Sequence, residues 1–286
     1  MTQDIVVGVD GTEEADTAAH WAASEARLRG GGVCLVYARE TWPGPPALFK
    51  AQETEAAWSQ DMLARTADEL RTRSPGLRVT TRLASSGPVS ALVTAAEAAD
   101  LVVLGSRALI GGAGYLVGSV GLAVAGTADC PVVLVRGAIG EDEPVGPITV
   151  GVDVEQASSD AVMGFAFEEA ARRRTGLTAV HVLRLPFYAM FGPAMVPDLR
   201  MTVAPDFERS LENLLAPWRA QYPGVRVTAS VVLGSAGREL VRRTDGTGLV
   251  VVGRRTRRSA MGAHTGSVAH AVLHHSRAPV AVVPHD

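Results

Sequence analysis

The chain alternates short segments that are apolar throughout with longer segments in which small apolar residues recur every three or four positions. The first pattern is typical of strands buried on both faces of a parallel sheet, and the second predicts amphipathic helices. In the first half we expect strands at 4–10, 33–38, 77–84, 101–104 and 131–135. Between them we expect helices over 13–29, 53–73 and 89–98, and a fourth helix from about residue 119.

The same order of elements returns in the second half. Ile-Val-Val-Gly-Val-Asp at 5–10 reappears as Ile-Thr-Val-Gly-Val-Asp at 148–153. We expect strands at 148–153, 177–183, 225–233, 249–252 and 279–283, and helices that begin near 158, 206, 236 and 267. Because solenoid units run only ~20–50 residues, a repeat this long indicates a duplicated domain. We therefore predict two domains, 1–140 and 147–286, joined by a short acidic linker, with each functional site present in two versions.

Strands that are apolar on both faces and separated by helices predict an α/β fold. Each half should be a doubly wound sandwich with a five-stranded, mainly parallel sheet and helices on both faces. In such sheets ligands bind in the crevice at the carboxyl ends of the strands, where the strand order reverses. The functional residues of each half are therefore expected at that edge.

Composition narrows the classes of partner. The net charge of −3 over 286 residues is too small to suggest a nucleic-acid partner. Two cysteines cannot form a disulfide framework, so we interpret them as buried thiols in a reducing, cytoplasmic compartment; we see no signal peptide. Residues 108–128 carry no charge and are long enough to span a bilayer, but their counterpart contains Arg257, Arg258, His264 and His270. We therefore expect no membrane span.

Polar and glycine residues recur in both halves at the expected crevice. They are Asp10 and Asp153 at the end of the first strand, Gly105 and Gly253 after the fourth strand, and Gly118-Ser119 and Gly266-Ser267 at the start of the next helix. Backbone N–H groups at a helix N-terminus, flanked by glycines, bind phosphates, and a nearby carboxylate accepts hydrogen bonds from ribose hydroxyls. This arrangement predicts a nucleotide pocket, although neither the dinucleotide-binding nor the P-loop glycine motif is present.

With these residues the chain resembles the universal stress protein family, in its tandem two-domain form. The family motif G-x2-G-x9-G-[ST] corresponds to Gly105-Ser106-Arg107-Ala108, nine residues and Gly118-Ser119 in the first half. In the second half it corresponds to Gly253-Arg254-Arg255-Thr256, nine residues and Gly266-Ser267. The resemblance covers nearly all of both halves. It implies strand order 3-2-1-4-5 in each domain, halves joined through their last strands, ATP binding as in the ATP-binding branch, and a homodimer.

The resemblance also implies a role for each matching residue. Val9 and Asp10, with Val152 and Asp153, would flank adenine and ribose, and Ala38 and Val182 would line the adenine pocket. The phosphates would be held by Gly105, Gly118, Ser119 and Val120, and by Gly253, Gly266, Ser267 and Val268, with Arg107 and Arg255 in the same loops. Both copies depart from the motif at its middle glycine, which is Ala108 in one and Thr256 in the other. If that position requires φ > 0, alanine costs about 1 kcal/mol and a β-branched threonine more.

Several residues keep a second interpretation. Asp10 and Asp153 could cap the following helices, the glycines could serve tight turns without a ligand, and the arginines at 254, 255, 257 and 258 could be a solvated charge run instead of a phosphate clamp. Tyr37 and His181 are expected in the core, and Trp58 and Trp218 as core or interface anchors. The histidines lack ligand spacing, so no metal site is predicted.

The predicted function is that of a cytoplasmic stress-response regulator that binds ATP, with Mg²⁺ accompanying the nucleotide. Its partners would be an adenine nucleotide and an unidentified regulatory protein, with neither nucleic acid nor membrane. No catalytic residue is predicted, because Ser106 and Ser119 have no local His or Asp partner and Lys50, the single lysine, lies in a proline-rich loop. The alternatives are a slow ATPase and a nucleotide-free interaction module of the same fold.

Overall fold

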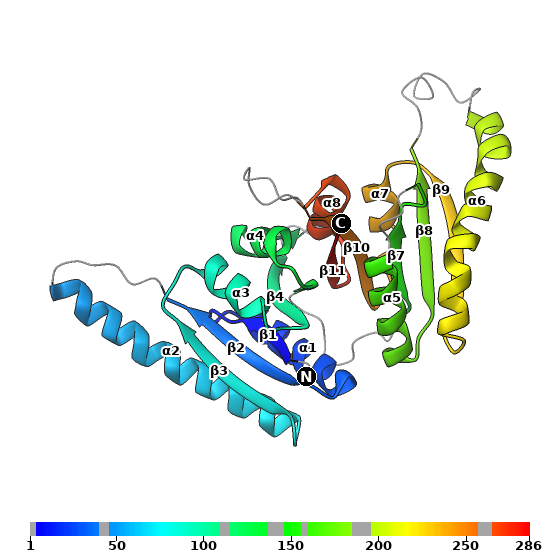
Figure 1. The fold of residues 1–286 in the computed structure, drawn as a ribbon. Helices are drawn as coiled ribbons and strands as arrows, with labels where there is room; N and C mark the ends of the chain where they lie inside the picture. The colour runs from blue at the N-terminus through cyan, green and yellow to red at the C-terminus, as the bar shows by residue number, and fades with distance from the viewer. Residues whose placement is uncertain are drawn as a thin grey trace. The chain divides into compact units, whose positions relative to one another are not determined.

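The protein forms two compact units in the computed structural model (Figure 1). The structure describes residues 4–39, 46–108, 115–136, 146–155, 160–184, 196–256 and 265–286. The described residues up to 136 make unit 1, and those from 146 onward make unit 2. Each unit is described by itself below.

Unit 1 is built on a parallel sheet with strand order β3-β2-β1-β4-β6. Its strands are β1 (Asp4–Gly8), β2 (Gly32–Ala38), β3 (Arg78–Ala84), β4 (Leu101–Ala108) and β6 (Val132–Arg136). The two-residue strand β5 (Tyr115–Leu116) pairs antiparallel with the end of β4. Apart from this short strand the order is 3-2-1-4-5, as predicted. The sequence did not reveal β5, because two residues carry no periodicity.

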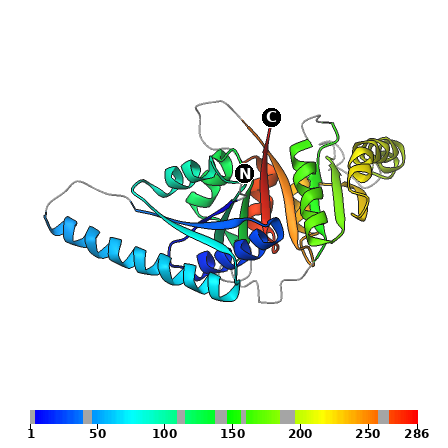
Figure 2. The same cartoon turned by 60° about the horizontal axis from the view of Figure 1, so that its bottom comes forward.

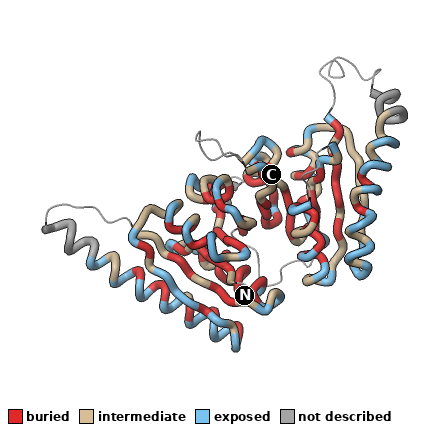
Figure 3. Tube along the Cα trace, in the orientation of Figure 1, coloured by how far each residue is buried: buried red, intermediate tan, exposed pale blue. Residues whose placement is uncertain are grey.

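Four helices cover the two faces of this sheet (Figure 2). Helices α1 (Glu13–Arg29) and α2 (Pro46–Arg73) pack together on one face, and α3 (Pro88–Ala96) and α4 (Ser119–Thr127) pack together on the other. The inner strands β1 and β4, with β6, are the most buried segments (Figure 3), and Ile5, Val7 and Val103 are fully excluded from solvent. Burial on both faces explains why these strands are apolar, whereas the edge strand β3 is mostly exposed and carries arginine and threonine.

Unit 2 repeats this architecture with strand order β9-β8-β7-β10-β11. Its strands are β7 (Ile148–Val152), β8 (Leu177–Leu183), β9 (Val227–Leu233), β10 (Leu249–Arg255) and β11 (Val280–His285). Its helices are α5 (Asp160–Arg173), α6 (Val196–Gln221), α7 (Ala236–Val241) and α8 (Ser267–His275). The predicted doubly wound fold is therefore confirmed in both units.

The element boundaries differ from the prediction mainly around proline. Helix α6 begins at Val196, about one-third of its length before the predicted start near residue 206, and Pro205 lies inside it. Proline lacks an N–H group and removes one helical hydrogen bond, which is why it suggested a boundary. Pro205 lies on an exposed part of the helix, where water can bond the carbonyl that is left. Similarly, α2 begins at Pro46, before the predicted residue 53.

The two units end their first helix in the same way with different residues. Gly30 after α1 has φ of 66°, and Arg174 after α5 has φ of 51°. In both, the following N–H group reaches back to a carbonyl five residues earlier, Gly31 to Ala26 and Thr175 to Ala170. Glycine adopts this left-handed conformation freely, whereas arginine does so at a cost.

No helix in the described ranges combines the length and apolar character needed to cross a membrane.

Candidate nucleotide site

The candidate site of each unit lies where the strand order reverses. In unit 1, β1 has β2 on one side and β4 on the other, and the chain leaves β1 toward α1 and β4 toward α4. Because the sheet is parallel, Asp10 after β1 and Gly118 before α4 share its carboxyl edge. Unit 2 places Asp153 after β7 and Gly266 before α8 at the equivalent edge.

Asp10 organises the turn that leads from β1 into α1. Its Oδ1 accepts hydrogen bonds from the Thr12 N–H (3.1 Å) and the Thr12 hydroxyl (2.6 Å). Thr12 is the N-cap of α1, and its Oγ1 accepts a bond from the Ala15 N–H (3.3 Å). The capping interpretation of Asp10 is therefore wrong in detail, because Thr12 caps the helix and Asp10 orients Thr12. The Asp10 residue remains exposed at the crevice.

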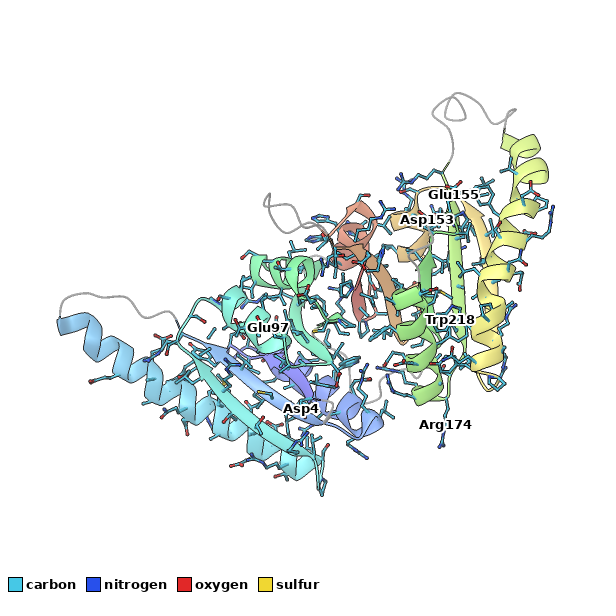
Figure 4. The ribbon with its side chains drawn as sticks, in the orientation of Figure 1. Asp4, Glu97, Asp153, Glu155, Arg174 and Trp218 are labelled. Carbon is cyan, nitrogen blue, oxygen red and sulfur yellow. The ribbon has the colours of Figure 1, made fainter. Side chains whose placement is uncertain are left out.

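Asp153 makes the matching turn in unit 2. Its Oδ1 accepts a hydrogen bond from the Glu155 N–H at 3.2 Å, two residues along the chain as in unit 1. Figure 4 shows Asp153 and Glu155 together at one end of the unit, with Arg174 at the other. Both units thus present an exposed aspartate, held by its own turn, at the carboxyl edge of the sheet.

The first glycine of each motif is required for close packing. A Cβ on Gly105 would lie closer than 3.0 Å to the backbone of Glu14 and Ala15, where the first turn of α1 crosses β4. A Cβ on Gly253 would lie 2.7 Å from Nε2 of His285 and 3.0 Å from Cγ2 of Val162. Both glycines therefore have a packing role, which differs from the tight turn considered for them; their predicted contact with phosphate stays a prediction.

The last glycine of each motif, Gly118 or Gly266, is open to solvent. Gly118 and Gly266 are the N-caps of α4 and α8, neither cap is made by a side chain, and no described atom would lie within 4 Å of a Cβ on either. The first N–H groups of a helix have no partner within it, so both helices present amide groups at an accessible end. The residues that follow are exposed serines, Ser119 and Ser267, and half-buried valines, Val120 and Val268.

The middle position of the motif requires no left-handed backbone. Ala108 ends β4 and pairs with Tyr115. The Thr256 N–H donates to the His285 carbonyl at 2.6 Å, and its hydroxyl donates to Asp286 Oδ1 at 2.8 Å. Arg174 is the one non-glycine residue with positive φ in the described part of the chain. The strain considered for Ala108 and Thr256 is therefore absent from the structure.

Each unit has an aromatic pair on one side of the crevice, the β2 side in unit 1 and the β8 side in unit 2. The rings of Tyr37 and Trp58 meet edge to face with centroids 5.9 Å apart, and those of His181 and Phe207 are stacked at 5.1 Å. His181 is buried as predicted, with Nδ1 3.0 Å from the Val152 carbonyl oxygen. Trp58 is 45% exposed, so the core interpretation is wrong for it. Sequence reasoning missed Phe207, although α6 carries it at the position that matches Trp58 in α2.

The remaining pocket residues behave alike in the two units. Val9 and Val152 are buried, while Ala38 and Val182 at the ends of β2 and β8 are half-buried.

Burial, followed by the hydrogen bond to Glu55 (3.1 Å), raises the pKa of Tyr37, so its hydroxyl stays protonated at neutral pH. Trp218 is instead half-buried between α5 and α6, stacked on Phe167 with centroids 5.8 Å apart (Figure 4).

The arginines of the two loops differ in environment. Arg107 and Arg255 are exposed at the ends of β4 and β10, and Arg107 lies 3.9 Å from the Glu14 carboxylate. Arg254 is buried, so it does not belong to a solvated run, and residues 257 and 258 lie outside the described residues. Over the described ranges no group of three or more His, Cys, Asp or Glu side chains is arranged to hold a metal ion.

Ser106 has a structural role that the sequence did not indicate. Its hydroxyl accepts a hydrogen bond from the buried Arg136 guanidinium at 2.8 Å and donates to the Val135 carbonyl at 3.2 Å. A serine committed to these two bonds holds the ends of β4 and β6 together. The fully buried Arg136 is the largest such side chain among those described.

Comparison with known proteins agrees with this architecture. The model of the universal stress protein family matches residues 1–136 and again residues 144–284. A universal stress protein of Mycobacterium tuberculosis is 35% identical over 97% of this chain and 96% of its own length. One from Mycolicibacterium smegmatis is 30% identical over 98% and 96%. The crystal structure of a universal stress protein from Archaeoglobus fulgidus, 16% identical, superimposes with a TM-score of 0.76 over 98% of both chains.

Proposed function

The chain belongs to the universal stress protein family, and we propose that each of its two units binds one molecule of ATP at the carboxyl edge of its sheet. One observation carries the proposal: an exposed aspartate and a helix N-terminus without a side-chain cap flank the strand-order reversal in both units. The amide groups suit phosphate oxygens and the carboxylate suits ribose hydroxyls.

The two ends of the site offer different chemistry to a nucleotide. Ser119 and Val120, with Ser267 and Val268, supply amide groups at the start of α4 and α8. Arg107 and Arg255 are exposed in the same loops, and a guanidinium can bind a phosphate with two hydrogen bonds. Asp10 and Asp153 already use Oδ1 in their own turns, which fixes the carboxylate before a ligand arrives. Mg²⁺ would accompany the triphosphate and offset its charge.

We further propose that the protein is a cytoplasmic regulator in the response to stress. It would form a homodimer and act by binding a regulatory protein partner. Among the described residues the crevice offers exposed aspartates and arginines but no paired nucleophile and base. This supports binding in preference to rapid catalysis. A slow ATPase is the enzymatic alternative.

The proposal is tested by measuring nucleotide on and in the purified protein. Native mass spectrometry of protein isolated without added ligand should show adenine nucleotide, and isothermal titration should show ATP binding that Asp10→Asn weakens in unit 1 alone. Product analysis over hours separates a regulator from a slow ATPase. If ATP fails to bind at millimolar concentration, the nucleotide-free interaction module is the better description.

A further inference from the structure

An exposed tryptophan stands next to the predicted ribose position in unit 1. Trp58 projects from α2, and the six-membered edge of its indole, at Cζ2 and Cη2, lies against the backbone of Gly11; a Cβ there would be 3.0 and 2.9 Å from these two atoms. Gly11 directly follows Asp10 and has φ of 80°. The indole is therefore fixed within one residue of the aspartate that faces the crevice, although nearly half of its surface remains exposed.

Tyr37 supports this indole from the neighbouring strand. Its ring meets the indole edge to face, with an interplanar angle of 72°, and its own position is fixed by the hydrogen bond that its hydroxyl donates to Glu55 on the same helix as Trp58. Among the described residues, Tyr37 is the one aromatic ring that meets this indole, and the two rings are not stacked. A large exposed aromatic side chain held by its neighbours is typical of a binding surface, because a merely structural tryptophan buries its area.

The order of the strands sets the direction in which a nucleotide would extend. The helix N-terminus at Ser119 belongs to the connection from β4, while Tyr37 and Trp58 lie on the β2 side of β1. A nucleotide with its phosphates at α4 and its ribose at Asp10 would direct its base toward β2. This argument rests on the proposed function.

We propose that Trp58 stacks on the base of the nucleotide bound in unit 1 and makes that site selective for purine over pyrimidine nucleotides. Stacking strength grows with the area of the two rings, and a purine offers two fused rings to the indole. The counterpart in unit 2 is built differently, because Phe207 lies flat on His181 with an interplanar angle of 11°. One face of Phe207 is already covered, so the two sites of the chain differ in how they recognise the base.

The test follows Trp58 directly in the full-length protein. The chain has four tryptophans, so labelling with 5-fluorotryptophan should give four ¹⁹F signals, and Trp58→Phe identifies the relevant one. ATP should shift the Trp58 signal, inorganic tripolyphosphate should leave it unchanged, and the signal of Trp218, which stacks on Phe167 in unit 2, serves as the internal control.

Binding measurements complete the test. Trp58→Ala should weaken ATP binding to unit 1 about tenfold to a hundredfold, while Trp58→Phe retains most of the affinity and the preference for ATP over CTP. Because nearly half of Trp58 is exposed, the alanine variant should lose only its contacts with Tyr37 and Gly11 and remain folded, with a slightly lower unfolding temperature. If wild-type protein binds ATP but the Trp58 signal does not move and Trp58→Ala binds normally, stacking is refuted while the proposed function stands. If wild-type protein binds no ATP, the proposed function itself fails.

Discussion

Replacement by alanine should affect stability very differently at the two glycines of the unit 1 motif, Gly105 and Gly118. In Gly105→Ala the new Cβ meets the backbone of Glu14 and Ala15, which cannot rotate away as a side chain can. Overpacking of a core costs about 1–3 kcal/mol, and because the clash is with backbone we expect Gly105→Ala to lose ~3 kcal/mol of unfolding free energy. In Gly118→Ala the Cβ enters open space at φ of −60°, and the gain of about 0.4–1 kcal/mol from a less flexible unfolded chain is offset by the similar cost of alanine at an N-cap, so little net change is expected.

Gly118→Ala, although stable, should impair ATP binding to unit 1. The open space beside Gly118 is where a phosphate would approach the amides of α4, so Gly118→Ala should weaken ATP binding to unit 1 although it folds well. Gly253→Ala is the matched control in unit 2, because its nearest neighbours are the side chains of His285 and Val162, which can adjust, and we expect a loss of about 1 kcal/mol.

The assay is urea unfolding followed by hydrogen exchange and mass spectrometry, which separates the stability of unit 1 from that of unit 2. Equilibrium dialysis with ATP is run on the same samples. The reasoning is refuted if Gly105→Ala is as stable as the wild type, or if Gly118→Ala destabilises unit 1 as strongly as Gly105→Ala does.

Three further predictions concern other parts of the chain. Arg174→Gly should stabilise unit 2 by about 0.5–1 kcal/mol in urea unfolding. The left-handed conformation costs arginine ~1–2 kcal/mol, and the greater flexibility of glycine in the unfolded chain cancels part of the gain from removing that cost. An unchanged unfolding midpoint would contradict this prediction. Asp10→Asn and Asp153→Asn should each weaken ATP binding to their own unit about tenfold in isothermal titration while preserving the turn, because an amide oxygen still accepts from the N–H group two residues on; equal loss at both sites from one variant would argue against independent pockets. Burial raises the pKa of Cys130 to about 11, so its thiol stays protonated near pH 8 and alkylation by iodoacetamide should accelerate about tenfold per pH unit from pH 7 to 10, whereas a plateau below pH 9 would show that the thiol is not shielded.

The fold was predictable because its signals are local and repeated. Strands buried on both faces read as continuous apolar runs, and α1 begins at Glu13 and ends at Arg29 as expected, since Thr12 caps its start and Gly30 its end. The longer α6 was missed because proline marks a boundary in most helices but is tolerated in this one at an exposed position.

The sequence predicted where the residues of the candidate site lie but not which structural role each of them has. Spacing placed Gly105 and Gly118 at the crevice, but only the packing of α1 against β4 distinguishes a glycine that avoids a backbone clash from one that faces open space. Likewise, Trp58 and Trp218 lie in matching helices, but Phe207 holds the position of Trp58, and Trp218 lies farther along α6, half-buried and stacked on Phe167.

The central claim is that the duplication preserved two working nucleotide sites. Equilibrium dialysis of the full-length protein against labelled ATP at millimolar concentration tests it most directly. The account predicts saturation at two ATP per chain, falling to one in Asp10→Asn and to one in Asp153→Asn at a subsaturating concentration that still fills the intact site. Saturation at one ATP per chain in the wild type, or the absence of binding, would contradict it.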